Sequence, residues 1–134
     1  MKKTYIGSCH CGAIRFEADI DLRQGTFKCN CSFCTKARNW LTAAKPDAFR
    51  LLAGDADLTD YQRTSTSNHN LFCKHCGIRA FGWGEAPELD GKFYGVNVTC
   101  LDDVDVNELL GAPIAYLDGR NDNYQSPPLE TRYL

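Results

Sequence analysis

Cysteine is the residue type most able to do chemistry in this chain, which has eight cysteines among 134 residues. Seven of them fall in three short clusters, and Cys100 stands apart. The clusters are Cys9-His10-Cys11, Cys29-Asn30-Cys31-Ser32-Phe33-Cys34 and Cys73-Lys74-His75-Cys76. Where the backbone turns tightly, cysteines at this spacing bring their sulfurs to within about 3.8 Å, as a tetrahedral zinc site requires. The spacing therefore favours zinc binding over disulfides or free thiols.

Two of the clusters end in the same dipeptide, Cys-Gly, at residues 11–12 and 76–77. A glycine after the second cysteine permits a positive φ, so the backbone can curl and aim N–H groups at the thiolates. Together the two clusters supply four thiolates, which is the ligand number of a closed, structural zinc site. Such a site would join the beginning of the chain to its middle. The expected ligands are Cys9, Cys11, Cys73 and Cys76.

The middle cluster differs because Cys29, Cys31 and Cys34 provide three ligands with no obvious fourth. A zinc ion with three protein ligands keeps a position for water or substrate, which is the usual arrangement in catalytic sites. Three thiolates also make a soft, anionic site that suits a fourth thiolate from a small molecule. The sequence therefore favours an open, catalytic zinc site here.

The alternative is that Cys100 or a histidine closes this second site. His10 and His75 lie between ligands, where the side chain usually points away from the metal, and His69 lies in a polar stretch. Cys100 follows an expected strand, and its simplest role is that of a small buried hydrophobe. We therefore expect none of these four residues to bind zinc.

The elements that must position the clusters are mostly short strands with alternating apolar and polar residues. Residues 4–20 predict a strand, a turn with glycine and cysteine, and a second strand that includes 13–18. Further strands are expected at 39–44, 58–64, 70–73, 79–83 and 92–98, and residues 49–52 lead from a turn into a break at Gly54-Asp55. Short helical turns or loops are expected at 32–39 and 102–109, and an irregular tail follows. The pattern predicts one mainly β domain over residues 1–134.

Composition excludes several classes of function. The formal charge of -2, from 15 basic and 17 acidic residues, provides no basic surface for nucleic acid. No apolar run approaches the roughly 18 residues of a membrane span, and none follows Met1-Lys2-Lys3 as a signal peptide would require. We therefore expect a cytoplasmic protein. In that reducing compartment, closely spaced cysteines more often bind metal or react than form disulfides.

The three cysteine motifs, in this order, resemble those of the glutathione-dependent formaldehyde-activating (Gfa-like) family, which includes centromere-protein-V-type proteins. The resembling segments are 7–16, 29–34 and 72–77, with further similarity at Phe49, Gly54, Leu58, Tyr61, 97–98 and 101–103. The resemblance implies a β-tent fold of small antiparallel sheets organised around zinc knuckles. It also implies two zinc ions per chain, a structural one on Cys9, Cys11, Cys73 and Cys76 and a catalytic one on Cys29, Cys31 and Cys34. Residues 118–122 look like one branch of the family.

The activity implied by this resemblance is that of a carbon–sulfur lyase, the reversible joining of formaldehyde and glutathione into S-hydroxymethylglutathione. The expected partners are therefore a small-molecule thiol and an aldehyde, with glutathione as co-substrate. Because glutathione carries two carboxylates, its site should offer cations. Lys36 and Arg38 are the best placed, while Arg79 would lie nearer the other zinc; otherwise all three are solvated surface charges. Two alternatives remain: a non-catalytic zinc-binding interaction module and a redox sensor that uses the middle cysteines.

Overall fold

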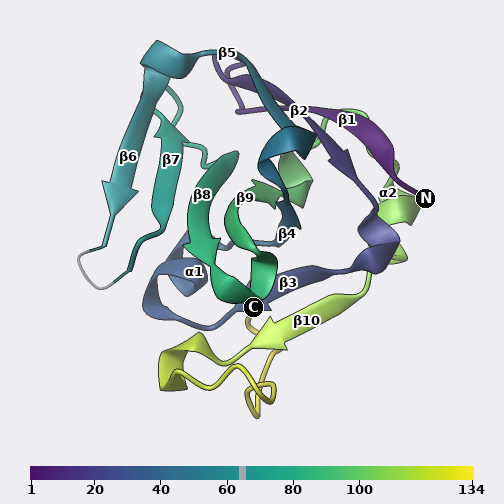
Figure 1. The fold of residues 1–134 in the computed structure, drawn as a ribbon, viewed down its shortest axis with the longest axis vertical. Helices are drawn as coiled ribbons and strands as arrows, with labels where there is room; N and C mark the ends of the chain where they lie inside the picture. The colour runs from purple at the N-terminus through teal and green to yellow at the C-terminus, as the bar shows by residue number, and fades with distance from the viewer. Residues whose placement is uncertain (64–65) are drawn as a thin grey trace.

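Two β-sheets form the framework of the chain in the computed structural model, which describes residues 1–63 and 66–134 (Figure 1). The smaller sheet has three antiparallel strands in the order β1-β2-β5. These strands are β1 (Lys3–Ser8), β2 (Arg15–Ile20) and β5 (Phe49–Ala53). Alternation places one face of β2 in the core, because Phe16, Ala18 and Ile20 are buried.

The larger sheet has seven strands in the order β10-β3-β4-β9-β8-β7-β6. All its pairs are antiparallel except β10 with β3, which is parallel. In chain order its strands are β3 (Thr26–Cys29), β4 (Leu41–Ala44), β6 (Leu58–Gln62), β7 (His69–Cys73), β8 (Phe81–Ala86), β9 (Gly91–Asn97) and β10 (Ile114–Leu117). The pairing with β3 brings the end of the chain to the strand that ends at Cys29.

The helices of the described chain are short. The two α-helices are α1 (Ser32–Ala37), directly after β3, and α2 (Val106–Leu110), which opens with a capping box between Asp105 and Glu108. Single 3-10 turns occupy Leu22–Gln24, Pro46–Ala48, Asp55–Asp57, Pro87–Leu89, Val98–Cys100 and Gly119–Asn121. No helix in this part of the chain has the length and apolar character that a membrane crossing requires.

An aromatic cluster joins the two sheets. Phe16 of β2 stacks on Phe49 of β5 with 5.4 Å between ring centroids, and Phe49 in turn meets Phe81 of β8 and Tyr94 of β9 at 4.7 and 4.2 Å. The Phe16 ring also covers Gly7, its cross-strand neighbour on β1, where any Cβ would collide with the ring. This core holds the smaller sheet against the middle of the larger one.

The expected mainly β fold is confirmed. The strands expected from alternation are present with shifted ends, and the expected helical turns appear as α1 and α2. The expected strand at 58–64 ends at Gln62, and residue 64 lies outside the described residues. Three strands were not expected: β5, and also β3 and β10, which have four residues each and little alternation. β10 lies in the tail, which was expected to be mostly irregular.

Candidate metal centres

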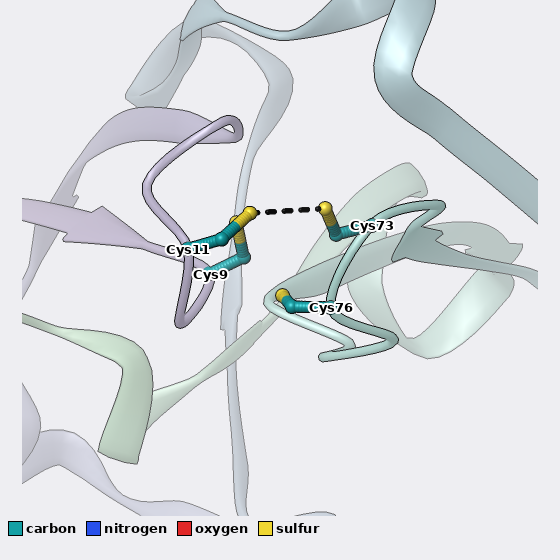
Figure 2. Close-up of side chains that lie close together, drawn as sticks. All are labelled: Cys9, Cys11, Cys73 and Cys76. Carbon is teal, nitrogen blue, oxygen red and sulfur yellow. Dashed lines mark hydrogen bonds between the residues drawn. The ribbon is translucent and has the colours of Figure 1, made fainter.

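The first and third cysteine clusters form two matching knuckles that face each other (Figure 2). In each, the first cysteine donates its backbone N–H to the carbonyl five residues later: Cys9 to Ile14 at 3.1 Å, and Cys73 to Ile78 at 3.0 Å. The glycine that follows each second cysteine has a positive φ, 83° at residue 12 and 77° at residue 77. The expected role of these glycines is thus confirmed, because an L side chain would strain both turns.

The four sulfurs of the knuckles have the spacing of a tetrahedral zinc site. Cys11 Sγ lies 3.7 Å from Cys9 Sγ and 3.6 Å from Cys73 Sγ, and all four sulfurs, with Cys76, lie within 4.8 Å of one another. Zinc–thiolate bonds of about 2.3 Å predict sulfurs about 3.8 Å apart, whereas a disulfide needs about 2.05 Å. Backbone N–H groups of Ile14 and His75 donate to Cys9 and Cys73 Sγ. This donor set fits a zinc ion, and we name it the four-cysteine cluster.

The three remaining clustered cysteines lie where β3 passes into α1. Cys29 is the last residue of β3, Cys31 is the N-cap of α1, and Cys34 lies in its first turn. Their sulfurs also lie within 4.8 Å of one another, and each side chain is half-buried. Because β3 changes into α1 within this short segment, the local backbone is enough to place all three sulfurs on the same side of the segment. We name this group the three-cysteine cluster.

Hydrogen-bond donors around the three-cysteine cluster suit thiolates. The N–H of Cys31 donates to Cys29 Sγ at 3.4 Å, that of Cys34 donates to Cys31 Sγ at 3.3 Å, and the Asn39 amide donates to Cys34 Sγ at 3.5 Å. The thiol of Cys29 lowers the pKa of Cys31, with Cys34 adding to the effect. The thiols of Cys29 and Cys31 raise the pKa of Cys34, and burial adds to that rise. The three thiols therefore titrate as a coupled group.

Asn30, between two of these cysteines, is held on every side by the C-terminal part of the chain. Its side-chain amide donates to Asp118 Oδ1 at 2.7 Å, and its Oδ1 accepts from the N–H of Arg120 at 2.9 Å. Its backbone N–H donates to the Leu117 carbonyl, and its carbonyl accepts from Arg120 Nε. Because Asn30 and Asp118 are both buried, these bonds fix the backbone that carries Cys29 and Cys31.

The sequence analysis missed this clamp, which consists of Asn30 and residues 117–120. The sequence analysis gave Asn30 no role, and residues 118–122 appeared there only as a segment that resembles one branch of the family. The one local signal was the turn-forming Asp118-Gly119 pair. Its partner lies 88 residues away, so the pairing emerges only once β10 docks beside β3.

The expected cations take different places around the three-cysteine cluster. Arg38 lines a cavity of about 30 Å³ beside Cys29 and Cys34, together with Lys28. Arg38 Nη1 donates to the Tyr133 carbonyl, and Lys28 Nζ donates to the Leu134 carbonyl at 3.3 Å. Lys36 is exposed on α1 and is not among the residues described as lining this cavity. The cavity has room for about one water molecule, so a larger ligand must cover the cluster from outside.

The candidate fourth ligands lie apart from both clusters. No histidine and no Cys100 atom joins the described sulfur groups. His75 Nε2 meets Asp57 at 3.0 Å, and His69 stacks on Trp83 with 3.9 Å between ring centroids. Burial raises the pKa of the Cys100 thiol to about 11, which keeps it protonated. The three-cysteine cluster therefore has no fourth protein ligand among the described residues.

Arg79 is not the solvated surface charge that one interpretation expected. Its side chain is largely enclosed, its Nε donates to Asn70 Oδ1 at 3.4 Å, and its buried Nη1 has no partner in the described part of the chain. Burial lowers the pKa of the guanidinium to about 10, and the charge of Cys34 opposes that shift. Sequence could not show this burial, because the residue follows an exposed turn.

The family of the chain follows from a comparison with known proteins. Residues 4–114 match the family model described as glutathione-dependent formaldehyde-activating enzyme. The chain belongs to this family. The match includes all seven clustered cysteines and Asn30, whereas most of β10, residues 117–120 of the clamp and the residues after them lie beyond it.

A solved structure has the same fold as this chain. The chain is similar to a Rhodobacter sphaeroides protein whose crystal structure was determined as a Northeast Structural Genomics target. The two are 30% identical, with a TM-score of 0.68, and the aligned region covers 82% of this chain and 99% of the other. The arrangement of the sheets is thus shared with an experimentally determined structure.

Proposed function

We propose that this protein is a zinc-dependent carbon–sulfur lyase that reversibly joins a small aldehyde, formaldehyde in the simplest case, to the thiol of glutathione. The observation that carries the proposal is the three-cysteine cluster, which offers three sulfurs and no fourth protein ligand among the described residues. Membership of the glutathione-dependent formaldehyde-activating family supports the choice of thiol and aldehyde. The four-cysteine cluster would hold a second, structural zinc.

A zinc ion on Cys29, Cys31 and Cys34 would supply Lewis acidity that lowers the pKa of a substrate thiol. The thiol proton passes to solvent, and the sulfur electron pair forms the new bond to the aldehyde carbon. The π electrons of the carbonyl move to its oxygen, which takes a proton from water. No oxidant or reductant is needed, and the reverse reaction follows the same steps.

The residues of the chain would orient the thiol and balance its charge. Backbone N–H groups and the Asn39 amide neutralise part of the charge on the cluster sulfurs. Lys28, Lys36 and Arg38 lie on or beside α1 and β3 and would attract the two carboxylates of glutathione. The half-exposed sulfurs leave the cluster open to a tripeptide that approaches from solvent.

The test compares the formaldehyde–glutathione exchange rate with and without protein, followed by NMR at equilibrium. Because the uncatalysed reaction is quick, the quantity of interest is the protein-dependent increment. Cys31→Ser should lose one zinc of two and the whole increment. Its fold should persist, because the knuckles still join residues 9–11 to 73–76.

Cys100→Ser is the matched control, since Cys100 lies outside both sulfur groups. It should retain two zinc ions per chain and the full increment. If wild-type protein loaded with two zinc ions adds nothing to the spontaneous rate, the proposed reaction is wrong. A non-catalytic interaction module would then be the better account of the domain.

A further inference from the structure

The segment after β10 forms one side of the three-cysteine cluster, although it lies beyond the part of the chain that matches the family model. After β10 the chain continues through the 3-10 turn Gly119–Asn121, beside β3 and α1 (Figure 1). The clamp on Asn30 fixes where this segment starts. Whatever side chains it carries are therefore held close to the cluster sulfurs.

Gly119 shows how closely this segment approaches the cluster. A methyl group built on Gly119 would lie 2.5 Å from Cys29 Sγ and 3.3 Å from Cys31 Cβ. The φ of Gly119 is not in the left-handed region, so the need for glycine here comes from space and not from backbone conformation. The sulfur of Cys29 thus lies directly against the main chain at this position.

The hydroxyl of Tyr124 borders the same small volume. The methyl position on Gly119 lies 3.3 Å from Tyr124 Oη, so this hydroxyl and Cys29 Sγ are both close to the same point. The hydroxyl has no hydrogen-bond partner among the described residues, and the side chain is 58% exposed. A tyrosine hydroxyl is protonated at neutral pH and can therefore donate a hydrogen bond. A neutral donor thus lies beside the thiolates and remains accessible from solvent.

We propose that Tyr124 is a catalytic residue that donates a hydrogen bond from Oη to the oxygen of the aldehyde as sulfur attacks its carbon. This inference rests on the proposed function. In the product, the former aldehyde carbon is bonded to the substrate sulfur. Its oxygen therefore lies two bonds from the sulfur that would occupy the fourth ligand position of the cluster. A phenol that borders the sulfurs is placed to stabilise the negative charge that develops on that oxygen. The remaining residues of the site offer donors to sulfur and to carboxylates, whereas this oxygen needs a donor of its own.

The experiment compares Tyr124→Phe with Tyr61→Phe. Tyr61 has similar exposure, 52%, and stacks on Phe33, so removing its hydroxyl is a matched change. Both variants should retain two zinc ions and bind glutathione like wild type. Tyr124→Phe should lower kcat for the exchange about 10- to 100-fold with KM for glutathione unchanged, because the lost contact exists only with the aldehyde oxygen. Tyr61→Phe should be unchanged.

A binding measurement provides a readout that does not depend on turnover. Wild type should bind S-hydroxymethylglutathione more tightly than S-methylglutathione, which lacks the hydroxyl, and Tyr124→Phe should lose that preference. If wild type accelerates the exchange and Tyr124→Phe does so equally, the role of Tyr124 is overturned while the proposed function stands. Loss of a zinc ion from Tyr124→Phe would also overturn it, because the hydroxyl would then be structural. If wild type accelerates nothing, the proposed function itself fails.

Discussion

Cys76 lies at the point where two distant parts of the chain meet. Its sulfur belongs to the β7–β8 turn, while Cys9 and Cys11 belong to the β1–β2 turn (Figure 2). The β1–β2 turn extends from the smaller sheet and the β7–β8 turn from the larger one. A zinc ion held by these four sulfurs would therefore bridge the two sheets at a single point, and loss of one ligand should affect the whole molecule.

Replacing Cys76 with serine should remove one of two zinc ions and much of the cooperative fold. Structural zinc binding is worth on the order of 10 kcal/mol in small peptides, which is comparable to the whole stability of an ordinary domain. Zinc per chain and the melting temperature should fall together. Unchanged zinc content and melting temperature in this variant would disprove the ligand assignment, and Cys100→Ser provides the control.

At the residue scale, local spacing is what made prediction possible. The seven clustered cysteines were grouped correctly because each cluster spans at most six residues. The feature that shapes each turn, a glycine or a helix N-cap, also lies within or next to its cluster. The roles of Asn30, Arg79 and Tyr124 were out of reach. Each depends on neighbours from another part of the sheet, and nothing in the adjacent sequence marks a residue for burial or for proximity to sulfur.

At the element scale, β10 is the strand that supports the backbone of the three-cysteine cluster. Its parallel pairing with β3 gives Asn30 its partners and leads the chain past Cys29. Some strands expected from alternation, such as β2, bury every second residue in the core. β3 and β10 escaped that criterion, because a four-residue strand near a sheet edge shows too little alternation.

Asn30→Ala should weaken metal binding at the three-cysteine cluster while the four-cysteine cluster keeps its metal. The change removes two side-chain hydrogen bonds, one buried and one partly buried, and leaves the N–H of Arg120 without its acceptor. Loss of partners that orient ligands commonly costs about 10- to 100-fold in metal affinity. Competition with a chromophoric chelator measures the affinity of each zinc ion, and only one of the two affinities should fall.

The matched control is Asn123→Ala on the same segment, whose exposed side chain bonds, within residues 1–63 and 66–134, only to Ser126 Oγ and the Gln125 N–H. It should leave both affinities unchanged. Equal zinc affinities for Asn30→Ala and wild type would show that the clamp does not position the ligands.

Glu108 joins α2 to β1 and makes that contact depend on pH. Its carboxylate accepts from Lys3 Nζ at 2.5 Å, from Tyr5 Oη at 2.7 Å and from the Asp105 N–H at 2.8 Å. These contacts, with Lys3 contributing most, lower the pKa of Glu108 to about 2. The stabilisation is therefore full above the ordinary glutamate pKa, near 4.5, and declines as pH falls from there toward 2.

Glu108→Gln should therefore be less stable than wild type near neutral pH, and the difference should narrow as pH falls toward 4. Urea unfolding of both proteins at each pH gives this difference, and any loss of metal affects both alike. Glu88→Gln, at an exposed glutamate on a 3-10 turn, serves as control. A difference that is constant from pH 7 to 4 would contradict the shifted pKa.

At the scale of the whole molecule, the two clusters differ in how far apart in the sequence their cysteines lie. The four-cysteine cluster draws ligands from segments 62 residues apart in sequence and bridges both sheets. The three cysteines of the other cluster all lie within β3, α1 and the residues between them. Loss of the first metal must separate distant parts of the chain, whereas loss of the second disturbs one corner that the clamp still holds.

Chelation should therefore remove zinc in two stages. The first equivalent should leave from the three-cysteine cluster, where one coordination position faces solvent, with little change in far-UV circular dichroism. The second should leave more slowly and together with cooperative unfolding, because the bridged sheets must part before a chelator reaches the buried Cys9 and Cys73 sulfurs. Cys31→Ser, which would hold only the bridging metal, should show the slow stage alone. Simultaneous release of both ions from wild type, or a fast stage in Cys31→Ser, would contradict this division between a bridging metal and a local one.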